Sequence, residues 1–242
     1  MRMHMKTTYT LLTLVFAACL TTVSCAQKIS GNGNVVKQDR PVEPFSAIEV
    51  GGVLSVHLEQ GDTEALSVEA DENLLDLIET EVRGNTLVVG LKKGIELKKA
   101  EQKDVYITLR QISQLEIGGV VHVESTTPIT AEDFDLEVGG VSSTSLELRC
   151  DRLQVEADMV GSLELRGEVG EATIRNGGVG TLQAFDLQVD KLTIKNSGVG
   201  SAEVQARNEI SISSSGIGSV RYKGDAVVKE LSTSGIGKVK KI

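Results

Sequence analysis

Three glutamates at matching places in the chain could do acid–base or cation chemistry. Glu116, Glu137 and Glu156 are separated by 21 and 19 residues. Carboxylates gathered on one face could hold a cation such as calcium, or serve as the acid and base of a polysaccharide-cleaving enzyme. If the chain stacks them, Arg175 and Lys195 continue the same row. A solvated charged face explains this pattern more simply, and a weak cation or ligand face is the functional alternative.

A second pattern that could do chemistry is a glycine pair around one aliphatic residue, as in "SGVG" (197–200) and "SGIG" (215–218). Glycine loops bind phosphate where a helix begins directly after them. Here the pattern recurs about every 19 residues, and no helix is expected after any copy. We therefore interpret the glycines as corners that require the absence of a side chain. These corners are Gly119, Gly140, Gly178, Gly180, Gly198, Gly200, Gly216, Gly218, Gly235 and Gly237.

Histidine and cysteine offer little further chemistry. His57 and His122 follow glycine turns, but no cysteine or third histidine lies near them in register, which argues against a metal site. Cys150 is the only cysteine after Cys25, so the folded part has no intrachain disulfide, and Cys150 is most simply an apolar filler. No Ser–His–Asp or Cys–His set can be assembled. We expect no enzyme activity, no metal and no cofactor.

The N-terminus has the pattern of an export signal. Residues 1–24 combine Arg2 and Lys6 with an apolar run over 11–20 that is too short to span a bilayer. The residues "TVSC" that end at Cys25 resemble a lipobox, in which this cysteine would be acylated. Cleavage after Ala26 is the alternative. We expect an exported protein of the cell envelope, either a lipoprotein or a periplasmic or secreted protein.

The charge of the chain restricts its partners. The sequence has 25 basic and 34 acidic side chains and a net charge of −9. Such acidity argues against nucleic acid and against electrostatic adsorption to membranes, so membrane contact would come only from a lipid anchor. With three tyrosines and four phenylalanines, the chain offers few aromatic platforms for a glycan groove.

Self-similarity dominates the second half of the chain. One aliphatic column lies inside the glycine turns: Val120, Val141, Val160, Val179, Val199, Ile217 and Ile236. Another lies five positions earlier: Leu115, Leu136, Val155, Ile174, Ile194, Ile212 and Leu231. Alternating polar residues indicate strands with one buried face, which predicts an all-β parallel β-helix of about 18–21 residues per coil. We expect both columns inside, so Val199→Asp should cost several kcal/mol by burying an unpaired charge.

The first half of the chain begins the same repeat and then interrupts it. Between residues 59 and 112 we expect a short helix over 72–78, with Asp71 as a possible N-cap, and a tight turn at Gly84-Asn85. Expected strands are 65–70, 80–83, 86–92 and 104–110. The predicted division is a signal peptide (1–24), an N-terminal tether (25–40), a first coil with a capping region that holds a hairpin and the short helix (41–114), and the β-helix repeats (115–242).

The last coil is rich in lysine. Lys238, Lys240 and Lys241 crowd the final predicted strand. Edge lysines discourage strand addition, so a solvated edge is the simpler interpretation. A docking edge for a partner or a second copy is the alternative.

The residues from Ser30 onward resemble a known family. The features that carry the likeness are Gly31-x-Gly33, Arg40, Phe45, the block "VEADENLLDLIETEV" and the later "SGxG" repeats, together with Ile48 and Gly52. They resemble the putative auto-transporter adhesin head GIN domain family over about residues 30–242. The resemblance implies a secreted or envelope-attached right-handed β-helix of Gram-negative bacteria, often an outer-membrane lipoprotein. It also implies a proposed adhesin role and brings no catalytic motif.

These observations favour a non-enzymatic envelope β-helix with an adhesin-like or structural role. Its partner would be an envelope or extracellular protein or glycan whose identity the sequence does not give. A carbohydrate-active enzyme on the same scaffold is one alternative. An assembly subunit that associates through its C-terminal coil is another.

Overall fold

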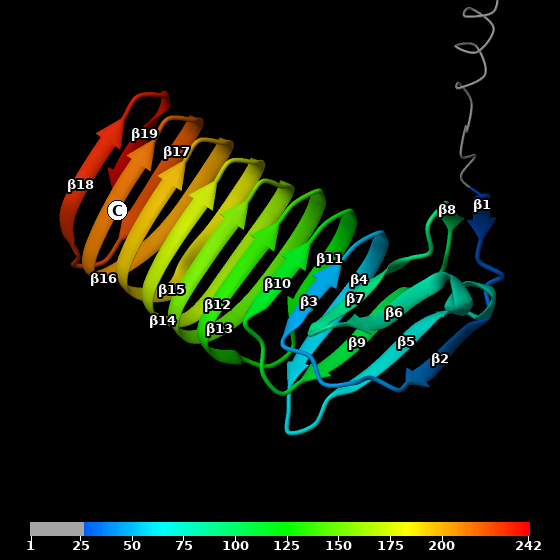
Figure 1. Cartoon of the computed structure of the whole chain (residues 1–242). Coiled ribbons are helices and arrows are strands. Elements are labelled where there is room, and N and C mark those ends of the chain that lie inside the picture. Colours follow the sequence, from blue (N-terminus) through cyan, green and yellow to red (C-terminus); the bar gives the residue numbers. More distant parts are fainter. Residues whose placement is uncertain (1–26) are drawn as a thin grey trace, which may run out of the picture.

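The computed structural model describes residues 27–242 as one long rod of stacked coils (Figure 1). The predicted signal peptide, Cys25 and the alternative cleavage site after Ala26 lie outside the described residues. Within them, no helix is long and apolar enough to cross a membrane. The elements before the repeats are β1 (Gln27–Ser30), β2 (Val35–Arg40), β3 (Ala47–Val50), β4 (Val53–Gln60), β5 (Ala65–Asp71), η1 (Glu72–Leu77), β6 (Ile78–Arg83), β7 (Thr86–Leu91), β8 (Ile95–Lys99) and β9 (Lys103–Leu109).

The repeats form a solenoid of about seven turns, as the sequence predicts. They comprise β10 (Gln114–Ile117), β11 (Val120–Ser125), β12 (Ile129–Val138), β13 (Val141–Ala157), β14 (Val160–Asn176), β15 (Val179–Asn196), β16 (Val199–Ser214), β17 (Ile217–Lys223), β18 (Val227–Thr233) and β19 (Ile236–Lys241). Strands of successive coils pair in parallel, for example β13 with β14 and β14 with β15. The strands β3 and β4 form the first coil beneath β10 and β11.

Stacked aliphatic side chains fill the interior of the rod. The column that begins at Leu115 is at most 1% exposed through Ile212. Burial of each such side chain is worth roughly 1.5–3 kcal/mol. Leu231 continues this column in the last described coil, where it is 53% exposed. The interior therefore relies on the stacking of successive coils.

The predicted burial of the glycine-flanked column is wrong. Its members from Val120 to Ile217 are 46–55% exposed, and Ile236 is 79% exposed. The reason is the two-residue period of a strand, because a separation of five residues reverses the face. Leu115, Ile117 and Val121 are buried, so Val120 points outward. The column does stack through the rod, but on its outer surface.

The glycines expected at coil corners lie where backbones of successive coils approach closely. A Cβ atom added at Gly200 would overlap the carbonyl oxygen of Gly180 in the preceding coil, and the φ of Gly200 is 138°. An added Cβ would also overlap a backbone oxygen of the preceding coil at the other nine predicted corners, which are Gly119, Gly140, Gly178, Gly180, Gly198, Gly216, Gly218, Gly235 and Gly237.

An N-terminal cap covers one end of the rod and contains the predicted hairpin and short helix (Figure 1). β2 and β9 both pair antiparallel with β5, while β9 stacks in parallel on β4. β6 and β7 form the hairpin. The cap thus supplies a closing layer that a bare coil would lack.

Two details of the cap differ from the sequence-based expectation. Asp71 makes no side-chain cap to η1, which is a 3-10 helix; its carboxylate accepts hydrogen bonds from the backbone N–H groups of Gly33 (2.6 Å) and Glu101 (2.9 Å). The described part of the expected tether contains β1, which pairs with β8, and β2. The N-terminal segment is therefore bound into the cap.

Candidate functional site

A continuous row of exposed aliphatic side chains runs along the rod. We call it the aliphatic ridge, made of Val53, Val120, Val141, Val160, Val179, Val199, Ile217 and Ile236. Each member is in direct strand register with the next. Because neighbouring strands lie about 4.8 Å apart, the ridge is about 34 Å long. An exposed apolar row of this length is the candidate contact surface.

Small residues beside the ridge leave its side chains accessible. Glycine follows the ridge residue directly in the coils of Val160, Val179, Val199, Ile217 and Ile236. Two residues after the ridge, a row of small hydroxyl residues runs in register: Ser143, Ser162, Thr181, Ser201 and Ser219. The aliphatic groups therefore project from a corner with little side-chain cover.

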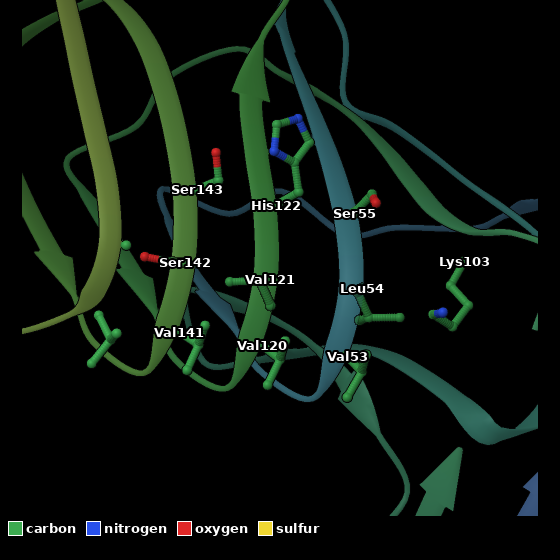
Figure 2. A pocket seen from close by; sticks show the side chains of 12 residues that line it. Val53, Leu54, Ser55, Lys103, Val120, Val121, His122, Val141, Ser142 and Ser143 are labelled. Atoms are coloured by element: carbon green, nitrogen blue, oxygen red, sulfur yellow. The ribbon is translucent and has the colours of Figure 1, made fainter. Parts of the chain in front are cut away.

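A shallow hollow of about 410 Å³ lies beside the first four rungs of the ridge. Figure 2 shows Val53, Val120 and Val141 side by side at the same end of neighbouring strands. His122 and Lys103 also line this hollow. It offers an apolar wall with a few polar groups, which suits a contact surface.

A second row, exposed except at the half-buried Ser213, runs along the strands that lead into the ridge, four residues before each ridge residue. We call it the charge row: Glu49, Glu116, Glu137, Glu156, Arg175, Lys195, Ser213 and Ser232. The three glutamates singled out in the sequence are thus in direct register. Among the described residues, no group of three or more His, Cys, Asp or Glu side chains is placed to hold a metal ion. The row is acidic over the first four coils and basic over the next two.

A cluster around His57 joins the cap to the rod. Its Nδ1 lies 2.8 Å from Oε1 of Glu124, and its Nε2 lies 2.9 Å from Oδ1 of Asp104. Both ring nitrogens can donate to these carboxylates only when the imidazole is protonated. Burial lowers the pKa of His57, but the hydrogen bonds and the negative charges of Asp104 and Glu124 outweigh burial and raise it.

The ring of His57 also stacks on Tyr106, with ring centroids 4.8 Å apart. Lys37 lies over the ring of Tyr106, with its Nζ 4.1 Å from the ring centroid. The Tyr106 hydroxyl donates a hydrogen bond to the carboxylate of Glu69 at 3.0 Å. The cluster brings together β2, β4, β5, β9 and β11. Sequence reasoning missed it because its members are far apart in the chain, for example 67 residues between His57 and Glu124, and share no local pattern.

Cys150 is buried, with its thiol on the inner face of β13. Burial, together with the negative charges of Asp151 and Asp133, raises the pKa of this thiol to about 12. The thiolate needed for nucleophilic chemistry is therefore scarce at neutral pH. Cys150 occupies space in the core, as the sequence predicts.

The last coil exposes both aliphatic and basic side chains. Three aliphatic side chains here are more than half exposed: Val227, Leu231 and Ile242. Strand β19 carries three lysines: Lys238, Lys240 and Lys241. This end is the docking edge considered in the sequence. Lysines along it oppose pairing between two such edges through like-charge repulsion.

Comparison with solved structures gives the same architecture. A putative adhesin from Bacteroides fragilis is 27% identical and superposes with a TM-score of 0.85, covering 88% of this chain and 100% of that one. A protein from Parabacteroides distasonis, described as a putative lipid binding protein, is 24% identical with a TM-score of 0.70, covering 89% and 100%. A putative adhesin from Parabacteroides merdae is 23% identical with a TM-score of 0.65, covering 90% and 100%. The latter two show the fold alone.

The family comparison rests on the sequence itself. No curated protein matches the chain. The model of one family matches residues 44–226, which span the first coil, most of the cap and the repeats up to β17. The chain therefore belongs to the family described as putative auto-transporter adhesin, head GIN domain.

Proposed function

We propose that this protein is a non-enzymatic, adhesin-like binding protein of the cell envelope, and that the aliphatic ridge is its contact surface. The observation that carries the proposal is the unbroken exposed row from Val53 to Ile236. Half-exposed aliphatic side chains on every coil add little to the core. Their burial against a partner is favourable, because it removes apolar surface from water. Membership of a family described by an adhesin role supports this use.

The envelope attachment in this proposal is a lipid on Cys25, which makes the protein an outer-membrane lipoprotein of a Gram-negative bacterium. β1 begins at Gln27, at the capped end of the rod. An anchor there directs the opposite end of the rod away from the membrane. Mass spectrometry of the mature N-terminus tests the attachment, because a diacylglyceryl group on Cys25 is expected. An unmodified chain that begins at Gln27 would instead indicate cleavage after Ala26 and a periplasmic or secreted protein.

The binding role is tested with cells that carry the protein on their surface. Adhesion of these cells to one another and to protein- or glycan-coated surfaces should fall when Val141 and Val160 are both changed to Asp. A matched control carries Val227→Asp, which is the same change at an exposed valine outside the ridge. Equal adhesion of all three strains, at equal surface amounts of protein, would reject the ridge as the contact surface.

A further inference from the structure

The spacing of the aliphatic ridge restricts what can cover it along its whole length. Successive ridge residues are about 4.8 Å apart, because they lie in register on neighbouring paired strands. A partner that meets every rung must present apolar groups with the same repeat over about 34 Å. A second solenoid with its own ridge meets this condition, and this chain supplies one.

The charge row gives the direction in which two such ridges fit. Its first four members are Glu49, Glu116, Glu137 and Glu156, and its last four are Arg175, Lys195, Ser213 and Ser232. The change of sign falls between the coils of Val160 and Val179. This position is also the midpoint of the eight ridge residues, with Val53, Val120, Val141 and Val160 on one side. The two rows therefore share one centre.

We propose that two copies of this protein pair antiparallel, ridge against ridge, about a two-fold axis that crosses the rods between the coils of Val160 and Val179. Each ridge then meets an identical ridge, as a two-fold interface requires. Glu156 faces Arg175 of the second copy, and Glu137 faces Lys195 of the second copy. The remaining glutamates of the row face serines, so no like charges meet.

The antiparallel orientation follows from the position of the charge row on one side of the ridge. A two-fold axis that lies in the contact plane and crosses the rods keeps both charge rows on the same side, where opposite charges meet. An axis parallel to the rods would instead place each charge row against the hydroxyl row of the other copy. Complementary charge thus selects the antiparallel pair.

This pairing rests on the proposed adhesin function for its biological setting, and it names the partner. In an antiparallel pair, the capped ends of the two rods lie at opposite ends of the assembly. Chains anchored near their capped ends would then come from two facing surfaces. The partner of the contact surface is accordingly a second copy of this chain on another envelope.

Sedimentation equilibrium of the purified protein tests the pair directly. We expect a monomer–dimer equilibrium that Val160→Asp weakens at least about tenfold, since each dimer then buries two unpaired carboxylates. Val227→Asp is the matched control and should leave the equilibrium unchanged. Circular dichroism confirms that both variants are folded. A strictly monomeric wild-type protein at high concentration contradicts the proposal, and so does dimerisation that only Val227→Asp abolishes, because that result assigns the contact to the last coil.

Charge reversal tests the direction of pairing. Glu156→Lys and Arg175→Glu should each weaken the dimer, because each places like charges opposite one another across the axis. The double variant should restore dimerisation to the wild-type level, since the opposed pair is re-formed with its signs exchanged. Failure of the double variant to recover, in protein that is folded, would reject the antiparallel pair.

Cysteine cross-linking tests the register. A chain with Glu137→Cys and Lys195→Cys should form a disulfide-linked dimer under mild oxidation, whereas neither single variant should. Within one chain these positions are three coils apart, so the link must join two copies. Cys150 is buried and its thiol has a pKa of about 12, so it does not compete. Equal cross-linking of a single variant would reject this register.

Two outcomes separate the pairing from the proposed function. If the purified protein stays monomeric while cells that display it still adhere through the ridge, the adhesin function stands and the pairing is wrong. If the protein dimerises as described but the displaying cells do not adhere, the pairing stands and the adhesin function is wrong.

Discussion

Two aliphatic columns of similar composition run through the same coils with opposite roles. The column from Leu115 to Ile212 is almost completely buried, whereas the aliphatic ridge from Val120 to Ile217 is about half exposed. Both are aliphatic, with Leu, Val and Ile in the buried column and Val and Ile in the ridge, and both repeat every 18–21 residues. Residue type and repeat length therefore define a coil, while odd or even spacing along the strand decides which side faces the core.

The largest expected effect comes from a charge in the buried column. Ile174→Asp should destabilise the protein by several kcal/mol and leave little folded chain, because Ile174 has no solvent access and its new carboxylate would have no partner. Urea unfolding monitored by circular dichroism measures this loss. Val179→Asp, five residues later in the same coil, is the matched control and should keep the native transition. A similar loss in both variants would mean that the two columns share one environment.

A smaller loss of stability is expected from a change at a coil corner, where the backbones of successive coils approach closely. Gly200→Ala should cost about 1–3 kcal/mol from backbone strain at positive φ alone. Its Cβ would also overlap the carbonyl oxygen of Gly180, which adds to the loss. Gly51→Ala is the control, because no atom lies within 4 Å of its added Cβ and its φ is ordinary. The free energies of unfolding of the two variants should therefore differ clearly; equal values would refute close stacking at the corner.

The junction between the cap and the rod should respond to pH. The folded-state pKa of His57 is raised above the unfolded value of about 6.5. Its contribution to stability is therefore complete below about pH 6.5 and is lost as the pH rises through the folded-state pKa. Urea unfolding at several pH values should show a wild-type advantage over His57→Gln that is larger at low pH. An advantage that grows with pH would contradict the two carboxylate contacts.

The smallest expected effect on stability is at the ridge itself. Val199→Asp should change the free energy of unfolding by less than about 0.5 kcal/mol, as is usual for exposed positions. This reverses the sequence-based expectation of a large cost. Thermal unfolding of Val199→Asp beside Ile194→Asp provides the comparison, since Ile194 is fully buried five residues earlier. A loss of several kcal/mol in Val199→Asp would indicate that Val199 is buried, contrary to the structure.

Much of the rod could be predicted because its strands and turns depend on local sequence patterns that repeat along the chain. Alternation around Leu136, Val155 and Ile174 predicts strands, and the regular interval predicts the stacked coils. The Gly84-Asn85 pair likewise predicts the hairpin turn, because Gly-Asn turn chemistry is local. The same alternation also predicts that Val120 points outward, because it lies an odd number of positions after the buried Leu115. The expectation of burial was wrong because it relied on the apolar character of Val120 rather than on its position in the alternation.

The remainder depends on contacts between distant residues. Glu124 and Asp104 meet His57 only because β11 and β9 both stack on β4. Asp71 precedes η1 like an N-cap, yet its carboxylate is taken by backbone N–H groups from two distant segments. Strands β1 and β8 are short and polar, so neither has a strong pattern of its own. Such features need the assembled structure.

The most direct test of the ridge as a contact surface measures stability and association on the same variant. In the double variant Val160→Asp, Val179→Asp, the free energy of unfolding should stay within about 1 kcal/mol of the wild-type value. Sedimentation equilibrium of the same sample should show loss of the dimer. A double variant that unfolds easily would contradict the exposure of the ridge. A double variant that dimerises as well as the wild-type protein would contradict the ridge as the contact surface.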